Sequence, residues 1–214
     1  MTNWEKALEV IEWRHVTPIV LPDNLFKWLK DKCWEQRNKK LEKDKMNKNL
    51  VGHIKEEYRI PTHPTDFERF IVSASAEGPS NEWYKKYAFN TEDRPIVFEN
   101  LWCNFQKKYE FNPPHTHSGV MSFVIFVNIP YNLDDEDKVY PDVKVDGKTQ
   151  HCTSRFMFIN TRLNGEIVTD ALNVDKSFEG KGFIFPNSQM HQVFPFYTSD
   201  DYRITVSGNL RYRV

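Results

Sequence analysis

Residues 182–209 read GFIFPNSQMHQVFPFYTSDDYRITVSGN, and this stretch decides the fold. It holds three short segments rich in aromatic and β-branched residues, GFIFP, HQVFPFY and YRITVSGN, with turn-forming residues between them. Segments of this composition and length predict β-strands. No helical pattern separates them, which favours an antiparallel sandwich or barrel over a parallel α/β sheet.

Short apolar and alternating segments of the same kind extend back to Pro95. IVFENLWCNFQ (96–106) alternates in polarity, and SFVIFVNI (122–129) is an apolar run bounded by turn signals. RFMFIN (155–160) and GEIVTD (165–170) add two further segments of this kind. We therefore predict a β-rich core over residues 96–212, interrupted at 131–151 by an acidic hairpin or surface insertion.

The N-terminal part up to about residue 95 is predicted to be mainly helical and to pack on this core within one domain, residues 1–214. Pro18 and Pro22 exclude a long helix in the first 22 residues. Asp23 is the predicted N-cap of a helix in which Leu25, Leu29 and Cys33 recur at helical spacing.

Three more segments complete this part. Residues 49–62 are predicted to form a short helix or a buried connector, residues 66–76 a second helix, and residues 81–89 a third. The lysine-rich stretch 37–48 has acids interleaved with its cations, so it is predicted to be a solvated face and not a nucleic-acid patch.

Composition limits the classes of binding partner and the cellular compartment that we expect for the protein. The formal net charge is −1, and no apolar run approaches the roughly 18 residues of a membrane span. Nucleic acid and membrane are therefore not expected as partners, and the N-terminus does not resemble a signal peptide. The three cysteines are odd in number and far apart, which favours a reducing cytoplasm, the host cytoplasm if the gene belongs to a phage.

The chemistry-bearing residues begin with a His-x-His in FNPPHTHSGVMSFVIF (111–126). On an extended strand, residues i and i+2 point to the same face, so His115 and His117 can converge on one metal ion at roughly 2.1 Å. His191 follows a proline turn at the head of another predicted strand, which makes it a third candidate ligand.

Arg203 and Thr205 share one face of the last predicted strand, and the other face, Ile204 and Val206, is apolar. An inward arginine followed two positions later by a hydroxyl suits a carboxylate, because the guanidinium forks onto two oxygens and the hydroxyl adds another donor. Asn104, on an earlier strand, is a candidate contact of the same ligand or of the substrate, and a buried, satisfied side chain is the alternative.

Taken together, this order of residues resembles the 2-oxoglutarate/Fe(II) dioxygenase superfamily over about residues 96–212. The segments NPPHTHSG, GFIFPNSQMHQVFP and RITVSGN are similar to those of a bacterial and phage-borne subgroup of oxygenases. The resemblance implies a double-stranded β-helix core of the jelly-roll or cupin-like type. It also implies Fe(II) on His115 and His191, 2-oxoglutarate on Arg203 and Thr205, O2 as oxidant, and no catalytic residue beyond the metal centre.

His117 departs from the superfamily pattern, which usually places Asp or Glu at this position. Three neutral imidazoles leave the ion with a charge of +2, whereas a site with one carboxylate leaves +1. From the sequence, His117 is either a ligand or a residue that supports a two-histidine site.

Two other functions fit part of the pattern. A cupin-type metalloenzyme without 2-oxoglutarate shares the barrel and three histidines, but its usual glutamate is absent from residues 118–122 and it has no use for Arg203. A non-catalytic β-barrel binding or structural module would only pack these histidines. The substrate stays open between a small molecule and a protein side chain, with prolyl hydroxylation suggested by analogy, and the sequence carries no signal of oligomeric state.

Overall fold

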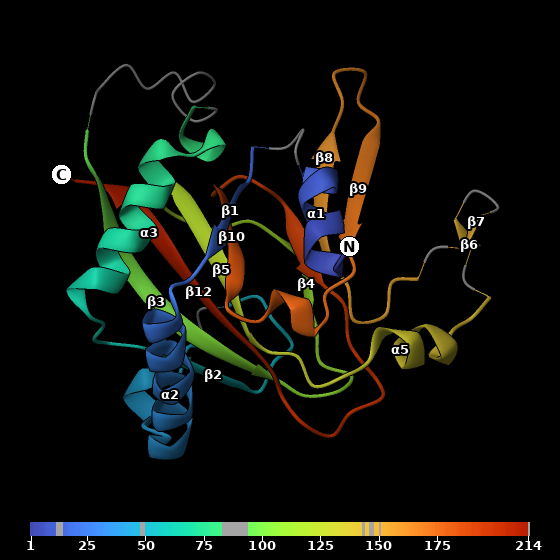
Figure 1. Cartoon of the computed structure of the whole chain (residues 1–214), viewed down its shortest axis with the longest axis horizontal. Coiled ribbons are helices and arrows are strands. Elements are labelled where there is room, and N and C mark those ends of the chain that lie inside the picture. Colours follow the sequence, from blue (N-terminus) through green and yellow to red (C-terminus); the bar gives the residue numbers. More distant parts are fainter. Residues whose placement is uncertain are drawn as a thin grey trace.

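The computed structural model describes residues 1–11, 15–47, 50–82, 94–142, 144–145, 148–149 and 151–213, which form two antiparallel sheets (Figure 1). The larger sheet has the strand order β1 (Thr17–Val20), β10 (Lys181–Pro186), β5 (Met121–Asn128), β12 (Arg203–Tyr212), β3 (Ile96–Gln106), β2 (Glu56–Arg59). The smaller sheet has the order β4 (Asn112–His115), β11 (His191–Val193), β8 (Phe156–Thr161), β9 (Ile167–Leu172). From β3 onward the chain crosses repeatedly between the two sheets, which is the predicted double-stranded β-helix.

Strand β5 shows why the sequence builds two layers of core. Its side chains at Phe123 and Ile125 belong to the core between the larger sheet and the helices. Those at Val124 and Phe126 belong to the core between the two sheets. Because both faces of the strand are covered, its sequence is an unbroken apolar run without alternation.

Two helices cover the outer face of the larger sheet (Figure 1). Helix α2 (Asp23–Lys39) buries Leu29 and Cys33, and helix α3 (Thr65–Glu77) buries Phe67 and Ile71, all four fully. The second predicted helix is thus confirmed. The predicted N-cap is wrong, because Asp23 is already the first residue of α2 and Pro22, whose fixed φ suits the entry to a helix, occupies the cap position. No helix among the described residues is long and apolar enough to cross a membrane.

The N-terminal part is less helical than predicted. Residues 49–62 contain strand β2, which pairs with β3, so the prediction of a helix or connector is wrong at 56–59. Strand β1 pairs with β10, and it follows an unpredicted helix α1 (Asn3–Ile11) whose Trp4 packs in the core between the sheets. Both strands exist because an open sheet edge is available, a tertiary cause that a local pattern does not reveal. The third predicted helix, 81–89, lies mostly outside the described residues.

The predicted insertion at 131–151 contains helix α5 (Leu133–Val139) and a short strand pair, β6 (Lys144–Val145) with β7 (Lys148–Thr149). Figure 1 shows the pair standing away from both sheets. The hairpin is as expected, whereas α5 was not predicted. Two 3-10 turns, Glu42–Asp44 and Lys176–Phe178, complete the described elements that bear on the fold.

Glu136 of α5 ties the insertion to the loop between β11 and β12. Its carboxylate is fully buried and accepts hydrogen bonds from the main-chain N–H groups of Tyr197 and Thr198 and from the Thr198 hydroxyl, at 2.6–3.1 Å. Hydrogen bonds to a buried charge are stronger than neutral ones. This carboxylate therefore holds in place the loop that leads into β12.

We expect Glu136→Gln to lower the free energy of unfolding by about 2 kcal/mol, because the amide keeps the shape but loses the charge and places a donor against N–H groups. Denaturant titration of the purified variant measures this. Glu166→Gln, at an exposed hairpin, is the matched control and should stay within about 0.5 kcal/mol of the wild type. Equal losses in the two variants would contradict the role given to Glu136.

Candidate metal centre

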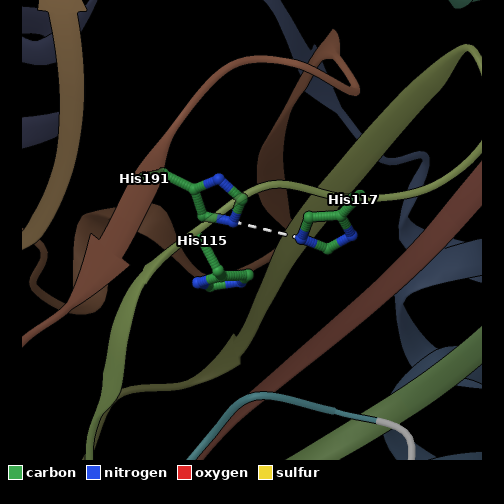
Figure 2. A group of neighbouring side chains, drawn as sticks. All are labelled: His115, His117 and His191. Carbon is green, nitrogen blue, oxygen red and sulfur yellow. Dashed lines mark hydrogen bonds between the residues drawn. The ribbon is translucent and has the colours of Figure 1, made fainter.

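Three histidines from different segments meet between the sheets (Figure 2). His115 is the last residue of β4, His117 lies in the loop toward β5, and His191 is the first residue of β11. The pairing of β4 with β11 places His191 opposite His115. One ring nitrogen of each histidine lies within 4.8 Å of the others, and the Nε2 atoms of His117 and His191 are 3.2 Å apart.

The other ring nitrogen, Nδ1, is committed to a hydrogen bond in all three rings. In His115, Nδ1 lies 2.7 Å from the main-chain oxygen of Pro113. In His117 it lies 3.1 Å from the side-chain oxygen of Asn209. In His191 it lies 3.0 Å from the main-chain oxygen of Gln189. A carbonyl oxygen only accepts, so each Nδ1 carries the proton. Each neutral ring therefore presents the lone pair of Nε2, the form in which histidine binds a metal.

The electrostatics of the site favour these neutral rings. Burial, followed by the charge of His115, lowers the pKa of His117 to about 4. Burial also lowers the pKa of His115, and it holds the pKa of His191 well below its usual value. Two Nε2 lone pairs at 3.2 Å repel one another unless a cation lies between them, and two bonds of roughly 2.1 Å to one ion bring the nitrogens to about this separation. The residues present therefore fit a divalent metal ion.

The geometry of the His-x-His differs from the prediction that both residues lie on one strand face. Strand β4 ends at His115, so His117 reaches the site from a loop. The main-chain N–H of His117 donates to the oxygen of Asn187 (3.0 Å), and its ring stacks on Trp102 with 5.9 Å between ring centroids. These contacts, and not strand alternation, orient His117.

Asn209 is a residue of the site that the sequence did not assign a role. It lies on β12, on the face that carries Arg203 and Thr205, and its oxygen accepts from His117 and also from the Ser122 hydroxyl at 2.8 Å. Both bonds end on the side-chain oxygen of Asn209, which faces the imidazole. The period of two along β12 was the available signal, since it places Asn209 on the inward face.

A cavity of about 420 Å³ opens beside the histidines. Its polar wall comes from β2, β3 and β12, with Glu57, Asn104, Thr205 and Ser207 among the lining residues. Its apolar wall comes from strands of both sheets, namely Val124, Phe126, Phe156, Phe185 and Val193. The cavity therefore brings polar and apolar side chains together beside the histidines.

Arg203 lines this cavity and is 2% exposed. Its guanidinium makes five hydrogen bonds of 2.7–3.1 Å, one for each of its N–H groups. The acceptors are the side chains of Gln106, which takes two, and Tyr131, and the main-chain oxygens of Ser154 and Phe194. All of them are uncharged, so the described residues give this buried cation hydrogen bonds but no counter-charge.

Thr205 and Asn104 also lie where the sequence placed them, side by side on paired strands. The Asn104 side-chain N–H donates to the Thr205 hydroxyl at 3.1 Å. Because the hydroxyl accepts this bond, its own proton is available for another acceptor. No described residue accepts that proton.

Comparisons with known proteins identify the family and the fold. The sequence model of a family described as "Putative 2OG-Fe(II) oxygenase" matches residues 100–209, just over half of the chain. A search of curated proteins found no match. The fold is similar to that of a prolyl-4-hydroxylase from Pseudomonas putida, with a TM-score of 0.53 and 14% identity over 98% of each chain.

It is also similar to a viral collagen prolyl hydroxylase from Paramecium Bursaria Chlorella virus-1 in its 2OG complex, with a TM-score of 0.50 and 9% identity over 95% of this chain and 99% of that one. At such low identity the two structures show the shared fold alone. The family match, carried by the segment that contains all three histidines and Arg203, shows more: the chain belongs to the 2-oxoglutarate/Fe(II)-dependent oxygenases, a family of oxidoreductases.

Proposed function

We propose that His115, His117 and His191 hold Fe(II), and that the chain couples O2 and 2-oxoglutarate to the oxidation of a C–H bond in its substrate. The observation that carries the proposal is the commitment of all three Nδ1–H groups to protein acceptors, which leaves three Nε2 lone pairs to share one ion. When bound, the ion and 2-oxoglutarate supply the oxidising chemistry, in which decarboxylation of 2-oxoglutarate drives C–H oxidation.

His117 is proposed as a ligand and not as a supporting residue. Its ring is oriented from both sides, by the Asn209 oxygen and by the Trp102 ring, with Nε2 turned toward His191. A supporting residue would instead accept a hydrogen bond from a ligand ring, yet the Nδ1 proton of His191 goes to the main-chain oxygen of Gln189. The site then carries three neutral imidazoles, and the full +2 charge of the ion remains to attract the anionic co-substrate.

Arg203 and Thr205 are proposed to bind the carboxylate of 2-oxoglutarate that lies away from the metal. A carboxylate would supply the counter-charge that the neutral acceptors around Arg203 do not, and a bond between two oppositely charged groups is stronger than one from the guanidinium to a neutral acceptor. Gln106 and Tyr131 are the side-chain acceptors that can move aside for it. Asn104 takes part by positioning the Thr205 hydroxyl so that its proton points toward the ligand.

The remaining residues orient the substrate and exclude water. The apolar wall, with Phe126, Phe156 and Phe185, keeps bulk water from the reacting carbon. No acid–base residue beyond the metal centre is proposed, because C–H oxidation of this kind needs no general base. The substrate is a small molecule or a protein side chain, of which a prolyl residue is the example suggested by analogy. A cytoplasmic location is proposed from the three cysteines, which are odd in number and far apart in the sequence, and of which Cys33 and Cys103 are buried thiols.

Family membership favours this function over the cupin-type enzyme and over the binding module. The cupin-type enzyme leaves Arg203 unexplained, because it uses no dicarboxylate. The binding module leaves the Nε2 separation unexplained, because neutral histidines that merely pack have no reason to bring two lone pairs to 3.2 Å.

We expect His117→Ala to weaken Mn(II) or Fe(II) binding by at least about 100-fold, because it removes a ligand. Asn209→Leu should cost roughly 10-fold to 100-fold, the usual effect of removing a hydrogen bond to a ligand ring. Calorimetric titration with Mn(II) measures both. His151→Ala, a half-buried histidine outside the cavity, is the control and should bind like the wild type. If His117→Ala retains wild-type affinity, the site is a two-histidine site.

We expect Thr205→Val to raise the Kd of 2-oxoglutarate about 10-fold without changing Mn(II) affinity, because one hydrogen bond to a carboxylate is worth roughly 1.5 kcal/mol. Arg203→Lys should have a larger effect, since lysine keeps the charge but loses the fork. Binding is measured calorimetrically on the Mn(II)-loaded protein, in which turnover is prevented. Thr169→Val, on the exposed face of β9, is the matched control. Unchanged 2-oxoglutarate affinity in both test variants would place the co-substrate elsewhere.

A further inference from the structure

The cavity holds a second group of polar side chains, whose oxygen atoms the metal centre and the 2-oxoglutarate site leave unexplained. Glu57 comes from β2, Asn104 from β3 and Asn112 from the start of β4, and all three line the cavity. We call these three residues the acceptor cluster. None of them is hydrogen-bonded to a histidine of the triad or to Arg203 among the described contacts.

The oxygen atoms of the cluster lack hydrogen-bond donors. The side-chain oxygens of Asn104 and Asn112 are buried and have no hydrogen-bond partner among the described residues. Glu57 is 1% exposed, and its carboxyl group accepts one hydrogen bond, from the Asn47 side chain at 3.2 Å. A buried polar oxygen without a donor costs free energy, so each of these atoms calls for a partner from outside the described protein.

The three oxygen-bearing groups lie close together. Glu57 and Asn104 are directly opposite one another on paired strands. Asn112 and Glu57 both lie next to Gly52. A Cβ at Gly52 would collide with the Asn112 oxygen and would lie 3.5 Å from a Glu57 oxygen. The glycine thus leaves room for the Asn112 amide beside the Glu57 carboxyl.

No nearby positive charge compensates the negative charge of an ionised Glu57 carboxylate among the described residues. No described cation lies within ion-pair distance, and Glu110 adds a second negative charge nearby. Burial, followed by Glu110, raises the pKa of Glu57 to about 8. Arg59, two residues along β2, also lines the cavity, but its side chain is exposed and keeps its charge in solvent. With one proton the Glu57 carboxyl can serve only one of the two unpartnered amide oxygens.

We propose that the acceptor cluster binds a protonated amine of the substrate, which makes the substrate an alkylamine or an amine-bearing amino acid. An ammonium group offers three N–H donors for three acceptors, and its charge is the one that a buried carboxylate lacks here. A carboxylate would bring no donor to these unpartnered oxygens. A prolyl residue within a peptide has no N–H to donate, so this inference, which rests on the proposed function of the same cavity, sets peptidyl proline aside.

The cluster has a consequence for stability that needs no ligand. Glu57 keeps its proton in the folded chain up to about pH 8 but loses it in the unfolded chain near 4.5. Stability from this residue is therefore complete below pH 4.5 and is lost as the pH rises through 8. We expect Glu57→Gln, which stays neutral, to unfold at a higher temperature than the wild type at pH 8.5 and at the same temperature at pH 4.5. Equal midpoints at pH 8.5 would show that Glu57 is not held neutral.

The amine itself is tested with n-butylammonium, n-butanol and butyrate as probes of equal length. Each is titrated calorimetrically into the Mn(II)-loaded protein with 2-oxoglutarate at pH 8. We expect n-butylammonium to bind, the other two to bind at least 10-fold more weakly, and Glu57→Gln to reduce the ammonium affinity at least 10-fold. Glu99→Gln, an exposed carboxylate on β3 outside the cavity, is the matched control and should bind like the wild type. Adding norleucine as a fourth probe distinguishes an amino acid from a simple amine, since tighter binding of norleucine assigns the amino acid.

Two further measurements separate the amine assignment from the proposed function. Thermal unfolding of the metal-free protein with n-butylammonium, n-butanol or butyrate reports amine binding without turnover, and of these three only n-butylammonium should raise the midpoint. Fe(II)-dependent conversion of 2-oxoglutarate to succinate reports the oxygenase by itself. If the protein converts 2-oxoglutarate but n-butylammonium binds no better than n-butanol, or binds equally to Glu57→Gln, the amine assignment is overturned and the oxygenase stands. If no 2-oxoglutarate is converted while the ammonium binds, the failure lies with the proposed function.

Discussion

The convergence of imidazole lone pairs is the constraint on which the rest of the structure depends. Two Nε2 atoms held at 3.2 Å repel each other, so the protein must fix each ring from its far side. It does so with one acceptor in the β4 segment, one on β12 and one in the turn before β11. These acceptors belong to both sheets, and their positions are only as rigid as the packing of one sheet on the other. The aromatic core between the sheets, with Phe158, Phe183 and Phe185, provides that rigidity.

A second constraint is the burial of Arg203. A buried guanidinium is costly, and here five hydrogen bonds offset part of that cost without a counter-charge. Two of the acceptors are main-chain oxygens of loops, those of Ser154 and Phe194. Glu136 links these loops, since its main-chain oxygen accepts from Thr153 and its carboxylate holds Tyr197. The insertion after β5, which looks peripheral, therefore supports the inner end of the cavity.

The sequence predicted most of the core and the identity of the histidines, but not how the site is held. Period-two alternation located β3 and β12, whose two faces meet different environments, and an apolar run located β5, whose two faces are both covered. Strand β2 was missed, because its pairing with the edge of β3 leaves no local pattern, and Glu57 was missed with it. The main-chain partners of Arg203, Ser154 and Phe194, could not have been predicted, since main-chain oxygens of loops have no sequence signature. His117 was predicted from alternation along a strand, but its ring is placed by a loop and by Asn209.

Arg203 and Glu57 lie at different places in the cavity and affect the electrostatics of the metal centre in different ways. Arg203 and a dication between three neutral rings together carry three positive formal charges, of which the two carboxylates of 2-oxoglutarate offset two. With a neutral Glu57, one positive charge remains. If the substrate brings an ammonium group, Glu57 can release its proton as that group enters, because the new cation is the partner its carboxylate lacks. The net charge of the cavity is then the same before and after the substrate binds. Recognition of the amine is thereby a local exchange of one proton for one cation, and it leaves the electrostatic field at the three histidines nearly unchanged.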